Sequence, residues 1–169
     1  AVKLAKAAIK LDPDQPTAHF VLGNAHKTSG EFLRASECFL VAMERRQPER
    51  ESWARSVFAA WEARGNAAPC GSKKNIFCGC ERCAALPEKP EWMRSRQAVA
   101  AMAERVVAAL PEDGNSWNMH ARAHRDLEDW STASKSYMKA ARLYGDEGDA
   151  AQKATALNNA QTCREKAEF

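Results

Sequence analysis

A two-helix pattern between Pro13 and Pro48 constrains the fold of this chain more than any other feature. Small and apolar residues return every three or four positions, which places them on one face of each of two short helices: Ala18, Leu22 and Ala25 in the first, and Ala35, Phe39, Ala42 and Met43 in the second. Gly30 is expected to supply the left-handed turn that ends the first helix, and Gly23 to leave room where the helices approach. Because such a hairpin cannot bury its own faces, the pattern predicts further hairpins beside it.

The hairpin pattern recurs along the chain at two offsets. An offset of 35 residues matches four pairs: Pro13 with Pro48, Leu22 with Val57, His26 with Trp61 and Gly30 with Gly65. An offset of 98 residues matches five pairs: His19 with Trp117, Phe32 with Trp130, Ala35 with Ala133, Phe39 with Tyr137 and Ala42 with Ala140. These residues resemble the tetratricopeptide repeat (TPR), a unit of about 34 residues built from two antiparallel helices. The resemblance implies an all-α fold, a right-handed solenoid of antiparallel helix hairpins with an irregular cysteine-rich loop insertion.

One repeat is interrupted by an insertion. The two offsets differ by 63 residues where one repeat of about 34 is expected, so about 29 residues are surplus. The surplus falls after Gly65, in a turn-rich segment that holds four of the six cysteines. The predicted organisation is TPR-like helices over residues 1–65 (a trailing helix, one full repeat and the first helix of the next), a cysteine-rich insertion over 66–89, and TPR-like helices over 90–169 (the second helix of the interrupted repeat, one full repeat and a final helix).

Glycine and proline mark the predicted helix boundaries. Gly65 is expected to close the helix before the insertion, and Pro90 to begin the helix after it. Gly145 is expected to end the last full hairpin, and Asp149 to cap the final helix. By register, residue 1 falls inside a second helix and the chain stops before another one, so we expect both termini to be cuts in a longer array.

Length, composition and charge exclude several classes of protein. A chain of 169 residues with 45% apolar content is long enough to bury a sizeable core. No stretch approaches the roughly 20 apolar residues of a membrane-spanning helix. The net charge of +3 is mild and scattered along the chain, so nucleic acid is not the expected partner.

The cysteines of the insertion are spaced C-x7-C-x-C-x2-C, at Cys70, Cys78, Cys80 and Cys83. Four thiolates can surround Zn²⁺ tetrahedrally at about 2.3 Å, and Gly71 and Gly79 would let the backbone turn tightly around the ion. Because the insertion has little apolar surface, a metal would supply the order that burial cannot. We therefore predict a structural zinc site here, and with it a reducing intracellular compartment, the cytoplasm or the nucleus.

Other interpretations of the cysteines stay open. Disulfides such as Cys70 with Cys83 would form in an oxidising compartment, the thiols could be unligated, or a part of the protein outside this sequence could complete the site. The run Cys78-x-Cys80-x2-Cys83 resembles the zinc-binding triplet that follows the catalytic domain in SET-type lysine methyltransferases of the SET and MYND family. That resemblance covers about six residues, and the catalytic signatures of the class are not in this sequence.

Two histidines share a face of a predicted helix. His120 and His124 are four residues apart, a spacing that can bind metal. They also occupy the positions of Leu22 and His26 in the repeat register, which are packing positions of the hairpin. The register favours core packing for both histidines.

The TPR resemblance implies a protein-protein interaction scaffold or adaptor rather than an enzyme, and a subunit of a larger assembly. A protein or peptide segment would lie in the concave groove, held by asparagines on the first helices of the repeats: Asn24, Asn118, Asn158 and Asn159. One alternative is an accessory TPR region of a larger enzyme, such as a SET-type lysine methyltransferase. Another is RNA binding through a zinc knuckle aided by Lys73, Lys74 and Arg82.

Overall fold

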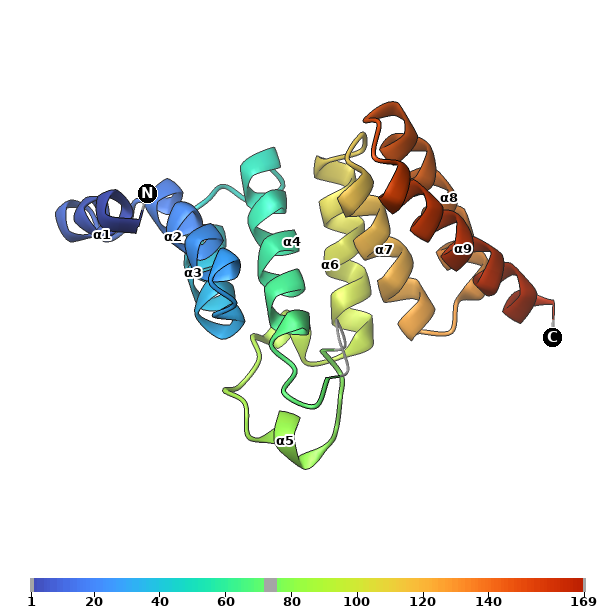
Figure 1. Ribbon diagram of the computed structural model, residues 1–169, viewed down its shortest axis with the longest axis horizontal. Coiled ribbons are helices and arrows are strands. Elements are labelled where there is room, and N and C mark those ends of the chain that lie inside the picture. Colours follow the sequence, from blue (N-terminus) through green and yellow to red (C-terminus); the bar gives the residue numbers. More distant parts are fainter. Residues whose placement is uncertain (1, 72–75, 169) are drawn as a thin grey trace. The chain divides into compact units, whose positions relative to one another are not determined.

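The computed structural model describes residues 2–71 and 76–168. Over these residues the chain is all-α, with no β-strand, and none of its helices combines the length and apolar character needed to cross a bilayer. The chain divides into two compact units, Ala1–Lys89 and Pro90–Phe169. Within each unit, consecutive long helices pack against one another as hairpins joined by short turns, and the four-residue helix Glu81–Ala84 (α5) lies in the loop that follows Asn66 (Figure 1). The right-handed superhelix, which involves both units, stays a prediction.

The first unit is built around α3. Its helices are α1 (Val2–Leu11), α2 (Pro16–Thr28), α3 (Phe32–Glu44), α4 (Glu51–Asn66) and the four-residue α5 (Glu81–Ala84). Helix α3 packs between α2 and α4 and buries Phe39 completely. On α4, Trp53, Val57 and Trp61 are all buried, as their four-residue spacing predicts for one helix face.

Gly23 allows α2 to approach α3 closely. A Cβ atom at this position would lie 2.7 Å from Cε1 of Phe39, whereas carbon atoms in contact prefer about 3.5–4.0 Å. We expect Gly23→Ala to lower the free energy of unfolding by up to about 2 kcal/mol, because overpacking costs about 1–3 kcal/mol and the gain in helix propensity returns about 1. Urea denaturation measures this loss.

The control for Gly23 is a smaller side chain at position 39. In the Gly23→Ala/Phe39→Leu double variant the added methyl group has more room, so we expect the combined loss to be smaller than the sum of the two single losses. Strictly additive losses would show that Gly23 is not required for the approach to Phe39.

The second unit is built around α8. Its elements are the 3₁₀ turn η1 (Glu91–Met93), α6 (Arg96–Ala109), α7 (Gly114–Asp126), α8 (Trp130–Asp146) and α9 (Ala150–Ala167). Every α-helix of this unit begins with a side chain that accepts a hydrogen bond from a backbone N–H three residues on: Ser95, Asp113, Asp129 and Asp149. The predicted cap at Asp149 is confirmed. Tyr137 and Ala133 of α8 pack between α7 and α9.

The 98-residue offset is visible in the hydrogen bonds of the two units. Ser36 and Ser134 each donate to an alanine carbonyl of the next helix, at 3.1 and 2.9 Å. The other matched pairs are His19 with the Pro13 carbonyl and Trp117 with the Pro111 carbonyl, and then His26 with Glu31 and His124 with Asp129. The repeat therefore extends from the apolar pattern to the polar contacts of the hairpin.

Tyr137 carries a buried hydroxyl without a hydrogen-bond partner among the described residues. Burial raises the pKa of this phenol to about 12. An unpaired buried hydroxyl is destabilising, so we expect Tyr137→Phe to raise the free energy of unfolding by about 1 kcal/mol. Tyr144 is the matched control because its hydroxyl donates to Oδ1 of Asn115 at 3.0 Å, and Tyr144→Phe should lose about 1 kcal/mol. Equal losses in the two variants, measured by urea denaturation, would contradict the assignment.

The glycines predicted to end helices lie close to the helix ends, but they differ in backbone conformation. Gly30, two residues after the end of α2, has a φ of 76°, as expected. Gly65 is the second-last residue of α4 and is buried, and Gly145 is the second-last residue of α8; neither has a positive φ. The left-handed turn after α8 falls on Gly148, whose φ is 79°. A glycine tolerates a left-handed turn without requiring one, so its presence alone does not place the turn.

The helix after the insertion also starts later than predicted. Pro90 precedes η1 rather than α6, and α6 begins at Arg96. Oγ of Ser95 accepts the N–H of Ala98 at 3.0 Å, a side-chain cap that proline cannot provide. Met93 of the intervening turn is fully buried.

Candidate metal centre

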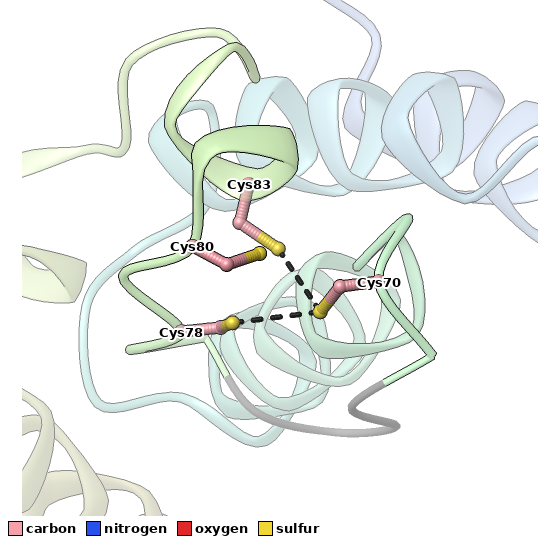
Figure 2. Close-up of side chains that lie close together, drawn as sticks. All are labelled: Cys70, Cys78, Cys80 and Cys83. Atoms are coloured by element: carbon pink, nitrogen blue, oxygen red, sulfur yellow. Dashed lines mark hydrogen bonds between the residues drawn. The ribbon is translucent and has the colours of Figure 1, made fainter.

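The four cysteines of the insertion converge on one point (Figure 2). Sγ of Cys70 lies 3.4 Å from Sγ of Cys78 and 3.4 Å from Sγ of Cys83, and all four sulfur atoms lie within 4.8 Å of one another. Sulfurs around a tetrahedral Zn²⁺ at about 2.3 Å would be about 3.8 Å apart, whereas a covalent S–S bond is about 2.05 Å long. The predicted convergence is confirmed, and the spacing fits metal coordination better than a Cys70–Cys83 disulfide.

Helix α5 brings the last two cysteines onto the same side of the chain. Cys80 is its N-cap, and the carbonyl of Cys80 accepts the backbone N–H groups of Cys83 and Ala84 at 3.0 and 2.9 Å. Residues three apart on a helical turn face the same direction, so this turn aims both thiols at Cys70 and Cys78. Cys80 is the most exposed of the four.

Two cations hold the insertion, one from the end of α4 and one from within the insertion itself. Arg64 of α4 donates to the carbonyl of Pro87, and Nζ of Lys89 donates to the carbonyl of Ile76 at 2.7 Å. Lys89 also lies 5.4 Å from the centre of the Phe77 ring. Among the described residues of 67–89, only Ile76 is a buried hydrophobic residue. The segment is therefore held by polar contacts and by its cysteines rather than by a core.

The charges around the cysteines suit a thiolate cluster. Desolvation raises the pKa of Cys83 to about 12, together with hydrogen bonds to the sulfurs of Cys70, Cys80 and Cys78, because these bonds stabilise the protonated thiol. Desolvation lowers the pKa of Arg64 and of Lys89, and the negative charge of a Cys83 thiolate opposes that shift in both. Four thiolates around Zn²⁺ carry a net charge of about −2. The positive charges of Arg64 and Lys89 would partly neutralise it.

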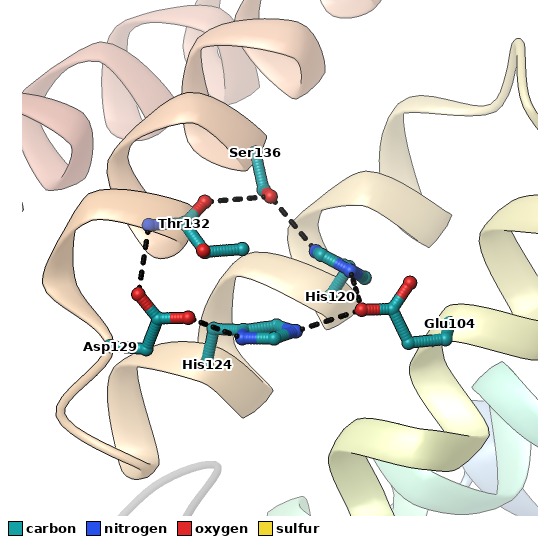
Figure 3. A network of polar contacts seen from close by, with 6 residues as sticks. All are labelled: Glu104, His120, His124, Asp129, Thr132 and Ser136. Carbon is teal, nitrogen blue, oxygen red and sulfur yellow. Dashed lines mark hydrogen bonds and ion pairs between the residues drawn. The ribbon is translucent and has the colours of Figure 1, made fainter.

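A second polar cluster lies in the other unit, where His120 and His124 of α7 meet Glu104 of α6 (Figure 3). His120 is buried, as the packing prediction requires. The prediction did not include Glu104, because this residue lies 16 positions before His120 and no sequence motif joins the two. The contact arises only from the packing of α6 on α7.

The four asparagines predicted to bind a partner differ in their exposure to solvent. Asn24 and Asn158 are exposed, on α2 and α9, and Asn159 is half-buried. Asn118 of α7 is half-buried and hydrogen-bonds the hydroxyl of Tyr144. Of the predicted RNA contacts, Arg82 is exposed, and Lys73 and Lys74 lie outside the described residues.

No protein-family model matches this sequence, and no curated protein matches it. The structure is similar to the crystal structure of MamA, a TPR-containing protein, with a TM-score of 0.53 and 13% sequence identity. The match covers 99% of this chain and 90% of the MamA chain. The chain has a TPR-like fold. At this level of identity the likeness supports the fold of helical hairpins and carries over no site.

Proposed function

We propose that this chain is a protein-interaction scaffold whose TPR-like hairpins hold a protein segment and whose insertion is braced by a structural zinc ion. The observation that carries the zinc proposal is the convergence of Cys70, Cys78, Cys80 and Cys83 in a segment with only one buried hydrophobic residue in its described part. Structural zinc sites of four thiolates supply folding free energy in small segments of this kind. The TPR-like fold supports the binding proposal, because stacked helical hairpins offer extended surfaces for partners.

Metal analysis tests the zinc proposal. We expect the Cys78→Ser/Cys80→Ser variant to hold one zinc ion per chain fewer than the native protein, when both are purified without chelator and analysed by elemental mass spectrometry. Cys38→Ser is the control, because Cys38 lies on α3 outside the cluster and its loss should leave the zinc content unchanged. Equal zinc in the native protein and the double variant would contradict the proposal.

Peptide selection tests the binding proposal. We expect peptides selected against the native chain to bind about tenfold more weakly to variants with alanine at Asn24 or at Asn158, because each exposed amide can hold a partner's backbone. Gln152→Ala is the control, since Gln152 is an exposed amide at the start of α9. Selected peptides that bind every variant equally would exclude these asparagines as contacts, and failure to select any peptide would contradict the scaffold.

A further inference from the structure

Three ligand-type side chains converge between α6 and α7, in the unit that does not contain the cysteines (Figure 3). Nε2 of His120 lies 3.0 Å from Oε1 of Glu104, and Nε2 of His124 lies 3.2 Å from the same oxygen. All three ligand atoms lie within 4.8 Å of one another. The two imidazole rings are close neighbours, with centroids 4.4 Å apart.

The partners of the other ring nitrogens decide where the protons are. Oγ of Ser136 donates to the carbonyl of Thr132 at 2.9 Å, so it can only accept from Nδ1 of His120, which lies at 2.8 Å. The carboxylate of Asp129 likewise accepts from Nδ1 of His124 at 3.1 Å. Each histidine therefore carries a proton on Nδ1.

These tautomers leave a gap in the hydrogen bonding. In the neutral rings both Nε2 atoms present lone pairs, and they face a carboxylate oxygen that also only accepts. Three acceptors at 3.0–3.2 Å with no donor among them require a cation. That cation is either a metal ion or a proton held on one of the rings, and the titration below distinguishes the two.

We propose that Glu104, His120 and His124 bind a divalent transition-metal ion of the Zn²⁺ class. Two imidazole nitrogens and one carboxylate form a known ligand set for such ions and leave at least one coordination position for water. The hydrogen bonds from Nδ1 to Asp129 and to Ser136 match the outer contacts that orient metal-binding histidines. Glu104 has a side chain 58% exposed, which gives the ion a path from solvent to the buried ring of His120 and the half-buried ring of His124.

The matching hairpin of the first unit has only one of the two histidines and does not form the cluster. His26 and Glu31 stand where His124 and Asp129 stand in the repeat, but Leu22 takes the place of His120. The hydrogen bond at the end of the hairpin thus belongs to the repeat, and the three-ligand cluster is specific to the second unit. The proposal is independent of the cysteine site.

Histidine side-chain NMR on the full chain, with Zn²⁺ as the titrant, tests this site separately from the cysteines. We expect Zn²⁺ to shift the Nε2 resonances of His120 and His124 saturably, and to leave those of His26 unchanged. Glu104→Gln keeps the size of the side chain and removes one charged ligand, so it should weaken Zn²⁺ binding by at least about tenfold. Glu112→Gln is the matched control, because Glu112 is an exposed carboxylate of the same unit that pairs with Lys139.

The same titration can overturn the proposal. Unchanged Nε2 resonances at saturating Zn²⁺ would mean that the three side chains share only a proton. Equal Zn²⁺ affinity in Glu104→Gln and in the native chain would exclude the carboxylate as a ligand. Because the side chain of Glu104 is more than half exposed, circular dichroism should show Glu104→Gln folded like the native chain, which keeps both outcomes interpretable.

Discussion

Trypsin is expected to cut the Cys78→Ser/Cys80→Ser variant after Arg82 at least about tenfold faster than it cuts the native protein. Arg82 is exposed and lies between two of the proposed zinc ligands, in α5. Binding of structural Zn²⁺ contributes about 10–16 kcal/mol in zinc-finger peptides. Loss of only about 1.4 kcal/mol against local opening raises the population of the open form tenfold, and cleavage of a transiently open segment follows that population.

The helices provide the control for this proteolysis. Arg34 is an exposed residue of α3, outside the insertion, so cleavage after Arg34 should stay slow in the variant. Treating the native chain with a chelator should reproduce the faster cut after Arg82, which covers the case in which the double variant folds poorly. Unchanged cleavage after complete removal of zinc would mean that the contacts of Arg64 and Lys89 hold the insertion without metal.

Phe39→Ala is expected to lower the free energy of unfolding of the first unit by about 3–5 kcal/mol. Phe39 is fully buried between α2 and α4, and its ring lies 5.2 Å from that of Phe20, centroid to centroid. Small domains are stable by about 5–15 kcal/mol in total, so the loss would bring this unit close to unfolding. Hydrogen exchange of the amides in α2 and α3, compared with the native chain, measures the effect locally.

Phe32→Ala provides a matched comparison in the same helix. Phe32 begins α3 and is only half-buried, so its truncation removes less apolar contact and should cost clearly less than that of Phe39. If the two substitutions cost the same, the core of the first unit would not depend on the packing of Phe39 against α2.

The helices were predictable because their signals are local. Trp53, Val57 and Trp61 identify the buried face of α4 from spacing alone, since a helix turns once every 3.6 residues. The cap at Asp149 was equally readable, because an N-cap side chain bonds a backbone group only three residues away. Such features need no knowledge of what packs against the helix.

Gly65 and Gly145 mark the helix ends to within one residue, since α4 ends at Asn66 and α8 at Asp146, but neither glycine makes a left-handed turn. Glycine permits a left-handed turn, but the chain makes that turn only where tertiary packing needs it, and after α8 it makes it at Gly148. Gly65 is buried in its helix, which is a property of its neighbours rather than of the glycine. Both predictions relied on a residue that is compatible with two conformations.

The sequence by itself determined the all-α class, the repeat, and the four cysteines within fourteen residues, because each follows from spacing along the chain. It also placed His120 and His124 on one face of a helix. Only the tertiary structure added Glu104 from α6, and only Ser136 and Asp129 showed which ring nitrogens hold protons. Contacts between helices depend on which faces pack together, and that choice is made by the folded molecule as a whole.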